Sequence, residues 1–132
     1  MQVLQPPDWV RPRGYSNGIV ASGRMAFIAG QVGWNGQEQF ESDDFVAQAR
    51  QALQNIVAIL AEAGGRPEHI VRMTWYILDK EEYLGCWREL GQAYREVIGK
   101  HWPVMSAVQI AGLIEHGAKL EIEATAVLPD EA

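Results

Sequence analysis

The sequence predicts an α+β fold in which two helices cover one face of a sheet of five or six strands. Three observations lead to this prediction. The expected elements follow one another as hairpin, helix, strand, helix, strand and strand. Each helix has a single apolar stripe, and the strands alternate between an apolar face and a mixed one. Elements with one apolar side bury that side against each other, which gives a two-layer sandwich.

Length, charge and composition narrow the class of protein. The chain of 132 residues suits one domain, 1–132, and 48% of the residues are hydrophobic, which is enough for a core. The net charge of −6 and the scattered basic residues argue against nucleic acid and against an anionic membrane as partners. No apolar run approaches a membrane span and no secretory leader is visible, so we expect a cytoplasmic protein.

The first part of the chain is expected to form an arm, a hairpin and a loop. Residues 1–13 contain three prolines and little periodicity, which indicates an extended arm. Two short apolar runs, 19–22 and 25–29, flank Gly23 and predict a β-hairpin that turns at this glycine. A glycine-rich loop follows over 30–36.

The first helix is expected to begin after Ser42, Asp43 and Asp44, because such side chains are typical of a helix N-cap. Gly64 and Gly65 should end it, since glycine is favoured just past a helix C-terminus. Its apolar stripe recurs every three or four residues and consists of Phe45, Ala49, Ala52, Leu53, Ile56 and Leu60.

A strand over 70–78 and a second helix come next. The helix should begin at Asp79, with Glu82 in a capping-box position, and end at Gly99. Its apolar stripe consists of Tyr83, Cys86, Trp87, Leu90, Tyr94, Val97 and Ile98.

Two strands complete the predicted sheet. The first lies within 102–113, opens at Pro103 and is expected to be buried. The second, 119–128, alternates between an apolar face and a face that carries Glu121 and Glu123.

The face of the sheet turned away from the helices is expected to be mixed in character. We place on it Arg72, Thr74, Tyr76, Met105, Ala107, Gln109, Glu121 and Glu123. This set is too apolar for a free surface and too polar for a core. Such a face is usually buried against another copy of the chain, with its polar groups lining a cleft. The sequence therefore predicts a homo-oligomer with pockets between subunits.

Glu121 and Glu123 are the first candidates for chemistry. A glutamate in a pocket can orient a water molecule or act as a general base. The alternative interpretation is an interface salt bridge with Arg72 or Lys119. The three histidines lack metal-ligand spacing, so no metal site is expected. The one cysteine, Cys86, is interpreted as a buried, unreactive thiol.

Other residues offer weaker signals. Ser106 lacks the G-x-S-x-G turn of a serine nucleophile, and the glycines after residue 29 do not form a phosphate loop. Trp34 and Trp102 lie in predicted loops, where they either form the wall of a pocket or pack at its rim; both interpretations stay open.

Four motifs stand in order along the chain, between residues 14 and 127. They are Gly14-Tyr15-Ser16, Ala29-Gly30-Gln31-Val32, Ala47-Gln48-Ala49-Arg50-Gln51-Ala52-Leu53-Gln54-Asn55 and Glu121-Ile122-Glu123-Ala124-Thr125-Ala126-Val127. In order and spacing they resemble the reactive intermediate deaminase superfamily, also called Rid or YjgF. The resemblance runs roughly from residue 14 to residue 128.

The resemblance implies a chorismate-mutase-like fold, with a six-stranded mixed sheet and two helices on one face. It also implies a homotrimer that binds a small molecule in the clefts between subunits. Active members of the family hydrolyse enamine and imine intermediates and need no cofactor. In those members an arginine in the motif Pro-Ala-Arg-Ser holds the substrate carboxylate, and a glutamate that opens Glu-Ile-Glu helps to place water.

One residue departs from this pattern. Pro103-Val104-Met105-Ser106 matches the arginine motif, with Met105 at the position of the arginine, and Ala107 replaces a cysteine found in many members. A carboxylate that meets Met105 would lose a charge-assisted pair worth about 1.5–3 kcal/mol. We therefore expect a neutral or cationic substrate, unless Arg72 replaces the missing cation. The longer second helix also suggests a divergent subgroup.

The resemblance assigns Glu121 as the catalytic residue. The substrate-binding candidates are Tyr15, Gly30, Gln31, Trp34, Arg72, Met105 and Ala107. The first hypothesis is an enzyme that hydrolyses an imine or enamine to a carbonyl compound and ammonia. The second is a binding module that holds a small metabolite without turnover. Ribonuclease activity is disfavoured, because the chain is acidic and shows no basic groove.

Overall fold

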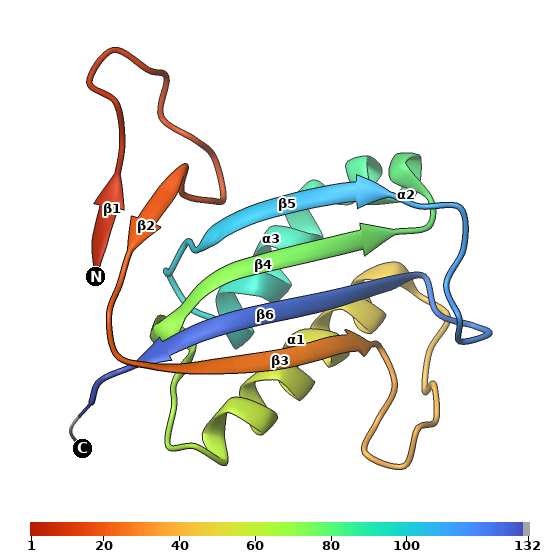
Figure 1. The fold of residues 1–132 in the computed structure, drawn as a ribbon. Coiled ribbons are helices and arrows are strands. Elements are labelled where there is room, and N and C mark those ends of the chain that lie inside the picture. Colours follow the sequence, from red (N-terminus) through yellow and green to blue (C-terminus); the bar gives the residue numbers. More distant parts are fainter. Residues whose placement is uncertain (131–132) are drawn as a thin grey trace.

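The computed structural model describes residues 1–130, so the last two residues of the predicted domain lie outside it. Figure 1 shows a curved sheet with helices packed behind it and a separate ribbon of two short strands. The elements are β1 (Gln2–Leu4), β2 (Gly18–Val20), β3 (Arg24–Val32), α1 (Phe45–Ala61), a 3-10 turn (Pro67–His69), β4 (Ile70–Ile77), α2 (Lys80–Gly85), α3 (Trp87–Val97), β5 (Val104–Gln109) and β6 (Leu120–Leu128).

Four strands form the main sheet, in the order β3-β6-β4-β5. β6 is antiparallel to β3 and to β4, whereas β4 and β5 run parallel. The predicted class, a mixed sheet with helices on one face, is confirmed. The strand count of the sheet differs from the expected six, because β1 and β2 pair only with each other in the described residues.

The hairpin predicted around Gly23 is wrong. β2 pairs with β1, and β3 pairs with β6, so the two runs that flank Gly23 belong to different sheets. Gly23 has a φ of 146°, and a Cβ there would lie 2.1 Å from the carbonyl oxygen of Leu128. Glycine is therefore required where β3 enters beside the end of β6. Within the predicted arm, residues 1–13, β1 forms a short strand.

The first helix forms as predicted. Asp44 is its N-cap, and the Asp44 carboxylate accepts a hydrogen bond from the backbone N–H of Ala47 at 2.9 Å. The helix ends at Ala61, and Gly64 follows with a φ of 75°, a conformation that glycine adopts without strain. All six residues of the predicted apolar stripe are buried.

The second helix is broken where one continuous helix was predicted. α2 and α3 are separated at Cys86, whose φ of −123° and ψ of 27° are not helical. Asp79 caps α2 as expected. Glu82 does not complete a capping box; its carboxylate accepts from the Lys119 ammonium at 2.8 Å and so ties α2 to the start of β6.

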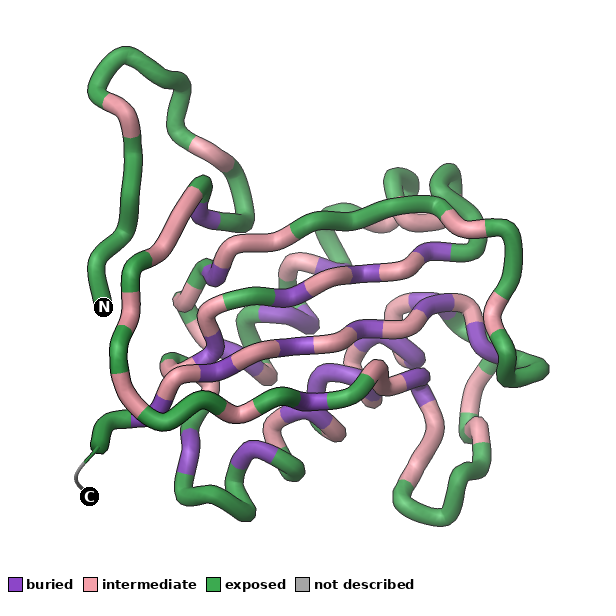
Figure 2. The backbone as a smooth tube through the Cα atoms, in the orientation of Figure 1, coloured by how far each residue is buried: buried purple, intermediate pink, exposed green. Residues whose placement is uncertain are grey.

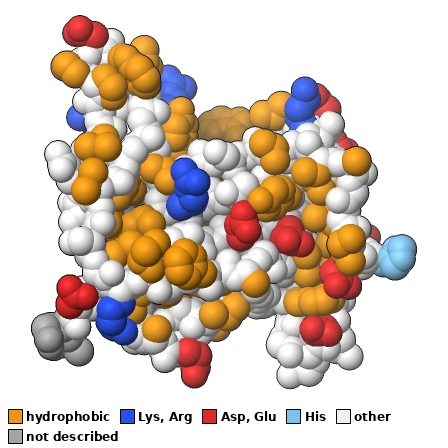
Figure 3. Space-filling view, in the orientation of Figure 1, with side chains coloured by type: hydrophobic (Ala, Val, Ile, Leu, Met, Phe, Trp, Pro, Cys, Tyr) orange, Lys and Arg blue, Asp and Glu red, His pale blue; other side chains and the backbone are white. Residues whose placement is uncertain are grey.

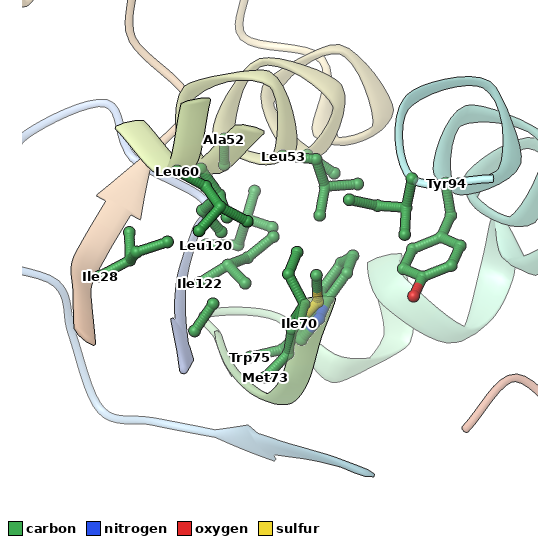
Figure 4. Close-up of a cluster of buried hydrophobic side chains, with 14 of the residues drawn as sticks. Ile28, Ala52, Leu53, Leu60, Ile70, Met73, Trp75, Tyr94, Leu120 and Ile122 are labelled. Carbon is green, nitrogen blue, oxygen red and sulfur yellow. The ribbon is translucent and has the colours of Figure 1, made fainter. Parts of the chain in front are cut away.

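The core lies between the helices and the sheet. Figure 4 shows Leu53 and Leu60 of α1 facing Leu120 and Ile122 of β6. These side chains are at most 1% exposed. Along β6, buried residues alternate with partly exposed ones, as the sequence predicted (Figure 2). The alternation leaves Glu121 and Glu123 on the face that no helix within residues 1–130 covers.

β5 is an edge strand and not the buried strand that was predicted. Its residues from Ser106 to Gln109 are exposed. In the main sheet of residues 1–130 it pairs with β4 alone, which leaves this edge of the sheet open in a single copy.

The parallel register of β5 also corrects its predicted faces. Met105 pairs with Met73 and Ala107 with Trp75, so both lie on the helix side of the sheet, as does Gln109. Paired residues in a ladder point to the same face. These residues were predicted on the open face because strand parity alone does not say which of the two β5 faces is aligned with Arg72.

Candidate functional site

The open face of the sheet brings polar residues of β4 and β6 together. Figure 3 shows this face, where acidic side chains lie near the centre among apolar ones. Tyr76 is paired with Glu121, and Thr74 with Glu123, in the β4–β6 register. The Tyr76 hydroxyl donates a hydrogen bond of 2.7 Å to Glu123 Oε1. The two carboxylates therefore have different surroundings.

The environment keeps Tyr76 protonated. The hydrogen bond to Glu123 is the main cause that raises the pKa of Tyr76 above its ordinary value, and burial and the charges of Glu123 and Glu121 act in the same direction. A protonated phenol is a fixed donor for Glu123. Glu121 accepts no hydrogen bond from residues 1–130, so its carboxylate is free to bind a water molecule or a ligand.

Glu121 lies against the backbone of β3. The β3–β6 register shifts between Ile28 and Gln31, and Gly30 falls within this irregularity. A Cβ on Gly30 would lie 2.1 Å from Glu121 Oε2, so only glycine leaves room for the carboxylate. Gln31 follows directly, and its side-chain amide donates to the carbonyl of Ala29 at 3.1 Å. The structure thus brings three predicted site residues, Gly30, Gln31 and Glu121, to one place.

The start of β6 is fixed from helix α1. Gln48 is only 1% exposed, and its amide nitrogen donates to the carbonyls of Gly117 and Ser42 at 2.8 and 3.0 Å. Its amide oxygen accepts from the backbone N–H of Lys119 at 2.9 Å. The buried amide is fully satisfied and holds the chain two residues before Glu121. The backbone that leads into Glu121 is therefore held by helix α1.

A second group of predicted site residues lies at the other end of β4. A hollow of about 200 Å³ is lined by Tyr15, Ser16, Asn17, Arg72, Val104, Met105 and Ser106. Ser16 is buried, and its backbone N–H donates to the carbonyl of Pro103 at 3.0 Å. The Ser16 hydroxyl donates to the carbonyl of Trp102. These bonds fasten the N-terminal segment to the beginning of β5.

The two groups are separate within one chain. Arg72 and Tyr76 are four residues apart on β4, and Tyr76 is paired with Glu121. At a rise of about 3.3 Å per residue, this spacing corresponds to roughly 13 Å along the strand. A ligand held by Arg72 would therefore not meet the Glu121 carboxylate of the same copy unless it spanned that distance.

The remaining candidates lie outside these groups or at their border. Trp34 packs against Phe40 with ring centroids 5.7 Å apart, in the loop after β3. Trp102 stacks on Tyr94 at 5.3 Å, which supports packing over a role as a pocket wall. Ala107 is exposed on the edge strand. Met105 borders the hollow, but its side chain is partly packed against the core.

Four residues of the hollow were not predicted as site residues: Ser16, Asn17, Val104 and Ser106. Asn17 follows the Gly14-Tyr15-Ser16 motif directly, so its position beside Tyr15 was a usable signal. Ser106 was considered only as a nucleophile, and its pairing with Thr74 on the open face depends on the parallel register.

The similarity to known proteins extends over most of the chain. Residues 10–128 match the family model described as Endoribonuclease L-PSP. The chain belongs to the Rid/YjgF family. Among solved structures, the Rid family protein YyfB of Yersinia pestis, whose function its description gives as unknown, superposes with a TM-score of 0.81 at 29% identity, over 96% of this chain and 98% of that one.

Two further proteins are similar to this chain over most of its length. Protein DfrA of Myxococcus xanthus is 32% identical over 93% of this chain and 90% of its own length. TdcF of Escherichia coli, which has the provisional name of a reactive intermediate deaminase, is 34% identical over 80% of each chain. A crystal structure of that protein with bound serine has a TM-score of 0.68 at 30% identity and covers 97% of this chain and 98% of that one.

Within residues 1–130, no helix has the length and apolar character needed to span a bilayer. The same residues contain no group of three or more His, Cys, Asp or Glu side chains arranged to hold a metal ion.

Proposed function

We propose that the protein hydrolyses an enamine or imine intermediate in clefts between the subunits of a homotrimer. The observation that carries the proposal is the position of Glu121, whose carboxylate lies against Gly30 on an open sheet face. Family membership supports it, as does the name given to the relative TdcF. A cytoplasmic location and the trimeric state remain predictions from the sequence.

The chemistry requires one base and one water molecule. Glu121 accepts a proton from water while the water oxygen adds to the carbon of the protonated imine, and the C=N electron pair moves to nitrogen. The resulting neutral carbinolamine takes up the proton from Glu121 at its nitrogen, its C–N bond breaks, and ammonia leaves. The hydroxyl proton is released as the carbonyl forms. An enamine enters the same sequence after its carbon is protonated.

The open face supports a site between copies. Phe27 and Met25 of β3 lie on this face and are 75% and 59% exposed, which is unusual for large apolar side chains. The hollow at Arg72 and the carboxylate at Glu121 are too far apart to act together in one copy. Association of copies through this face would bury the apolar residues and place the hollow of one copy near the Glu121 of another.

The second candidate function is a binding module without turnover. The observation that favours it is Met105, which brings no charge to the hollow and is partly packed against the core. A neutral or cationic ligand, as predicted from Met105, would suit such a module.

Replacement of Glu121 tests the first candidate. We expect Glu121→Gln to lower the rate of hydrolysis of freshly generated 2-iminopropionate, or of a neutral imine, by about 10²- to 10⁴-fold, because general base catalysis contributes about that much. Release of the carbonyl product and of ammonia would be followed against a blank without protein.

Glu89→Gln, an exposed glutamate in the first turn of α3, is the matched control and should retain full activity. Equal turnover by Glu121→Gln and the parent would refute the role of Glu121. Ligand binding by the parent with no turnover of any imine would favour the binding module.

A further inference from the structure

We propose that Arg72 is the anion-binding group of the hollow, so that the ligand of this protein carries a carboxylate. The proposal deepens the proposed function, since it names the class of ligand, and it assigns a specificity-determining residue on β4. It stands on the composition of the hollow, on the register of β4 and β5 and on the contacts that other arginines make.

The residues that line the hollow are suited to an anion. Arg72, Ser106, Tyr15 and Asn17 contribute side chains with hydrogen-bond donors, and none of the seven lining residues is acidic. A volume of about 200 Å³ suits a small ligand and not a polymer. A guanidinium with hydroxyl and amide donors beside it is the arrangement that binds carboxylates in proteins.

The register places Arg72 beside the start of β5. Arg72 is paired with Val104, the residue before Met105. Paired positions on neighbouring strands are about 4.8 Å apart, so a guanidinium on β4 reaches the same space that a side chain from the start of β5 borders. A cation is therefore available at this hollow although Met105 is neutral.

Several other arginines have side-chain or backbone partners, whereas Arg72 forms no hydrogen bond or ion pair among residues 1–130. Arg50 forms an ion pair with Glu96, Arg88 lies over the ring of Trp87, and Arg24 donates to the carbonyl of Pro129. Arg72 is exposed, and it is the only basic side chain on the open face of the described strands β4, β5 and β6. Its planar fork can hold both carboxylate oxygens at once.

The hollow is also held in shape. The two bonds from Ser16 to the backbone of Pro103 and Trp102 fix the segment that contains Tyr15 and Asn17. The Asn17 side-chain amide donates a hydrogen bond of 2.9 Å to Gln5 Oε1, and this bond orients the Asn17 amide. Donors that are positioned before binding lose less entropy when the ligand arrives.

A matched pair of small molecules tests the proposal on the intact protein. Pyruvate and its neutral amide, pyruvamide, have nearly the same shape and differ in charge. We expect calorimetry or ligand-observed NMR to show that the parent binds pyruvate more tightly than pyruvamide. Arg72→Met should weaken pyruvate binding by about 10- to 100-fold, the loss of one charge-assisted pair, with pyruvamide unchanged.

Three further variants sharpen the test. Arg72→Lys should recover only part of the preference for pyruvate, because an ammonium lacks the planar fork. Arg72→Met combined with Met105→Arg should restore much of it, since both positions border the hollow. Arg95→Met, an exposed arginine in the last turn of α3, should bind both molecules like the parent.

The results separate this inference from the proposed function. Equal binding of pyruvate and pyruvamide by the parent, or an unchanged preference in Arg72→Met, would overturn the role of Arg72 even if neutral imines were hydrolysed. Loss of oligomeric mass in Arg72→Met without a change in the preference would do the same and would assign Arg72 to an ion pair between copies. A preference that depends on Arg72, in a protein that hydrolyses no imine, would support the anion site and contradict the deaminase.

Discussion

At the scale of single residues, Gly30 decides where the Glu121 carboxylate lies. The space above Gly30 is filled by Glu121 Oε2, and the atom in contact is the end of a flexible side chain. Gly33, three residues later, differs in one respect: a Cβ there would lie 2.5 Å from the Cα and carbonyl oxygen of Gln48, which are backbone atoms of α1. Gly30 therefore leaves room for a carboxylate, and Gly33 allows β3 to pack closely against α1.

The contrast between these glycines gives a prediction. Gly30→Ala should fold normally and move the Glu121 carboxylate, with a loss of about 10² in the rate of hydrolysis, as a displacement of about 1 Å can cause. Gly33→Ala should mainly lower the midpoint of thermal unfolding. Gly36→Ala, where a Cβ meets nothing within 4 Å, is the control for both measurements. Full activity in Gly30→Ala would show that the position of Glu121 does not matter for turnover.

At the scale of elements, Tyr94 connects helix α3 to the turn before β5. Its hydroxyl donates to the carbonyl of His101 at 2.7 Å, and its ring stacks on Trp102. Burial raises the pKa of Tyr94 above its ordinary value of 10.0. The folded protein therefore holds this proton more tightly than the unfolded chain does.

The stability that Tyr94 contributes should fall at alkaline pH. The contribution of the Tyr94 hydroxyl to stability is fully present below pH 10.0, and it is lost as the pH rises from there toward the raised pKa of the folded state. We expect Tyr94→Phe to lower the free energy of unfolding by about 1 kcal/mol near neutral pH. The same variant should lose less stability than the parent between about pH 8 and about pH 11.

Urea unfolding at the two pH values provides the measurement, with Tyr15→Phe as a control because that tyrosine is exposed. Tyr76 and Tyr83 also have raised pKa values, so part of the alkaline loss should persist in Tyr94→Phe. An alkaline slope identical to that of the parent would contradict the burial argument.

Elements differ in how far their sequence predicts them. Helix α1 was predicted correctly, because its cap at Asp44, its apolar stripe and its terminating glycines are all local signals. The partner of β3 was not predicted, since β3 pairs with β6 near the far end of the chain. The same long-range pairing brings Gly30 to Glu121, so the sequence indicated both residues only through the family resemblance and did not show that they touch.

At the scale of the whole molecule, the open sheet face is the main unexplained surface of a single copy. It combines exposed apolar side chains of β3 with the polar groups of β4 and β6 (Figure 3). The mixed character of this face was predicted from β4 and β6, where the parity was correct. It failed for β5, because the sequence does not specify how a parallel edge strand is aligned with its neighbour.

Phe27 provides a test of what covers this face. We expect Phe27→Asp to reduce the molecular mass in solution from that of an oligomer toward that of one chain, because a charge would have to be buried at the interface. Analytical ultracentrifugation measures the mass. Leu84→Asp, at a 54% exposed position of α2 in the helix layer, should keep the parental mass. An unchanged mass in Phe27→Asp would show that Phe27 lies outside any interface.

The exposed edge of β5 matters most to a chain that has just been made. Beyond the single bridge between Ser16 and Val104, its outer backbone groups have no strand partner within residues 1–130. Unpaired strand edges recruit other strands, correct or incorrect. In a newly synthesised copy, assembly with other folded copies therefore competes with aggregation with unfolded chains. Slow expression at low temperature, which keeps unfolded chains scarce, should raise the yield of soluble protein.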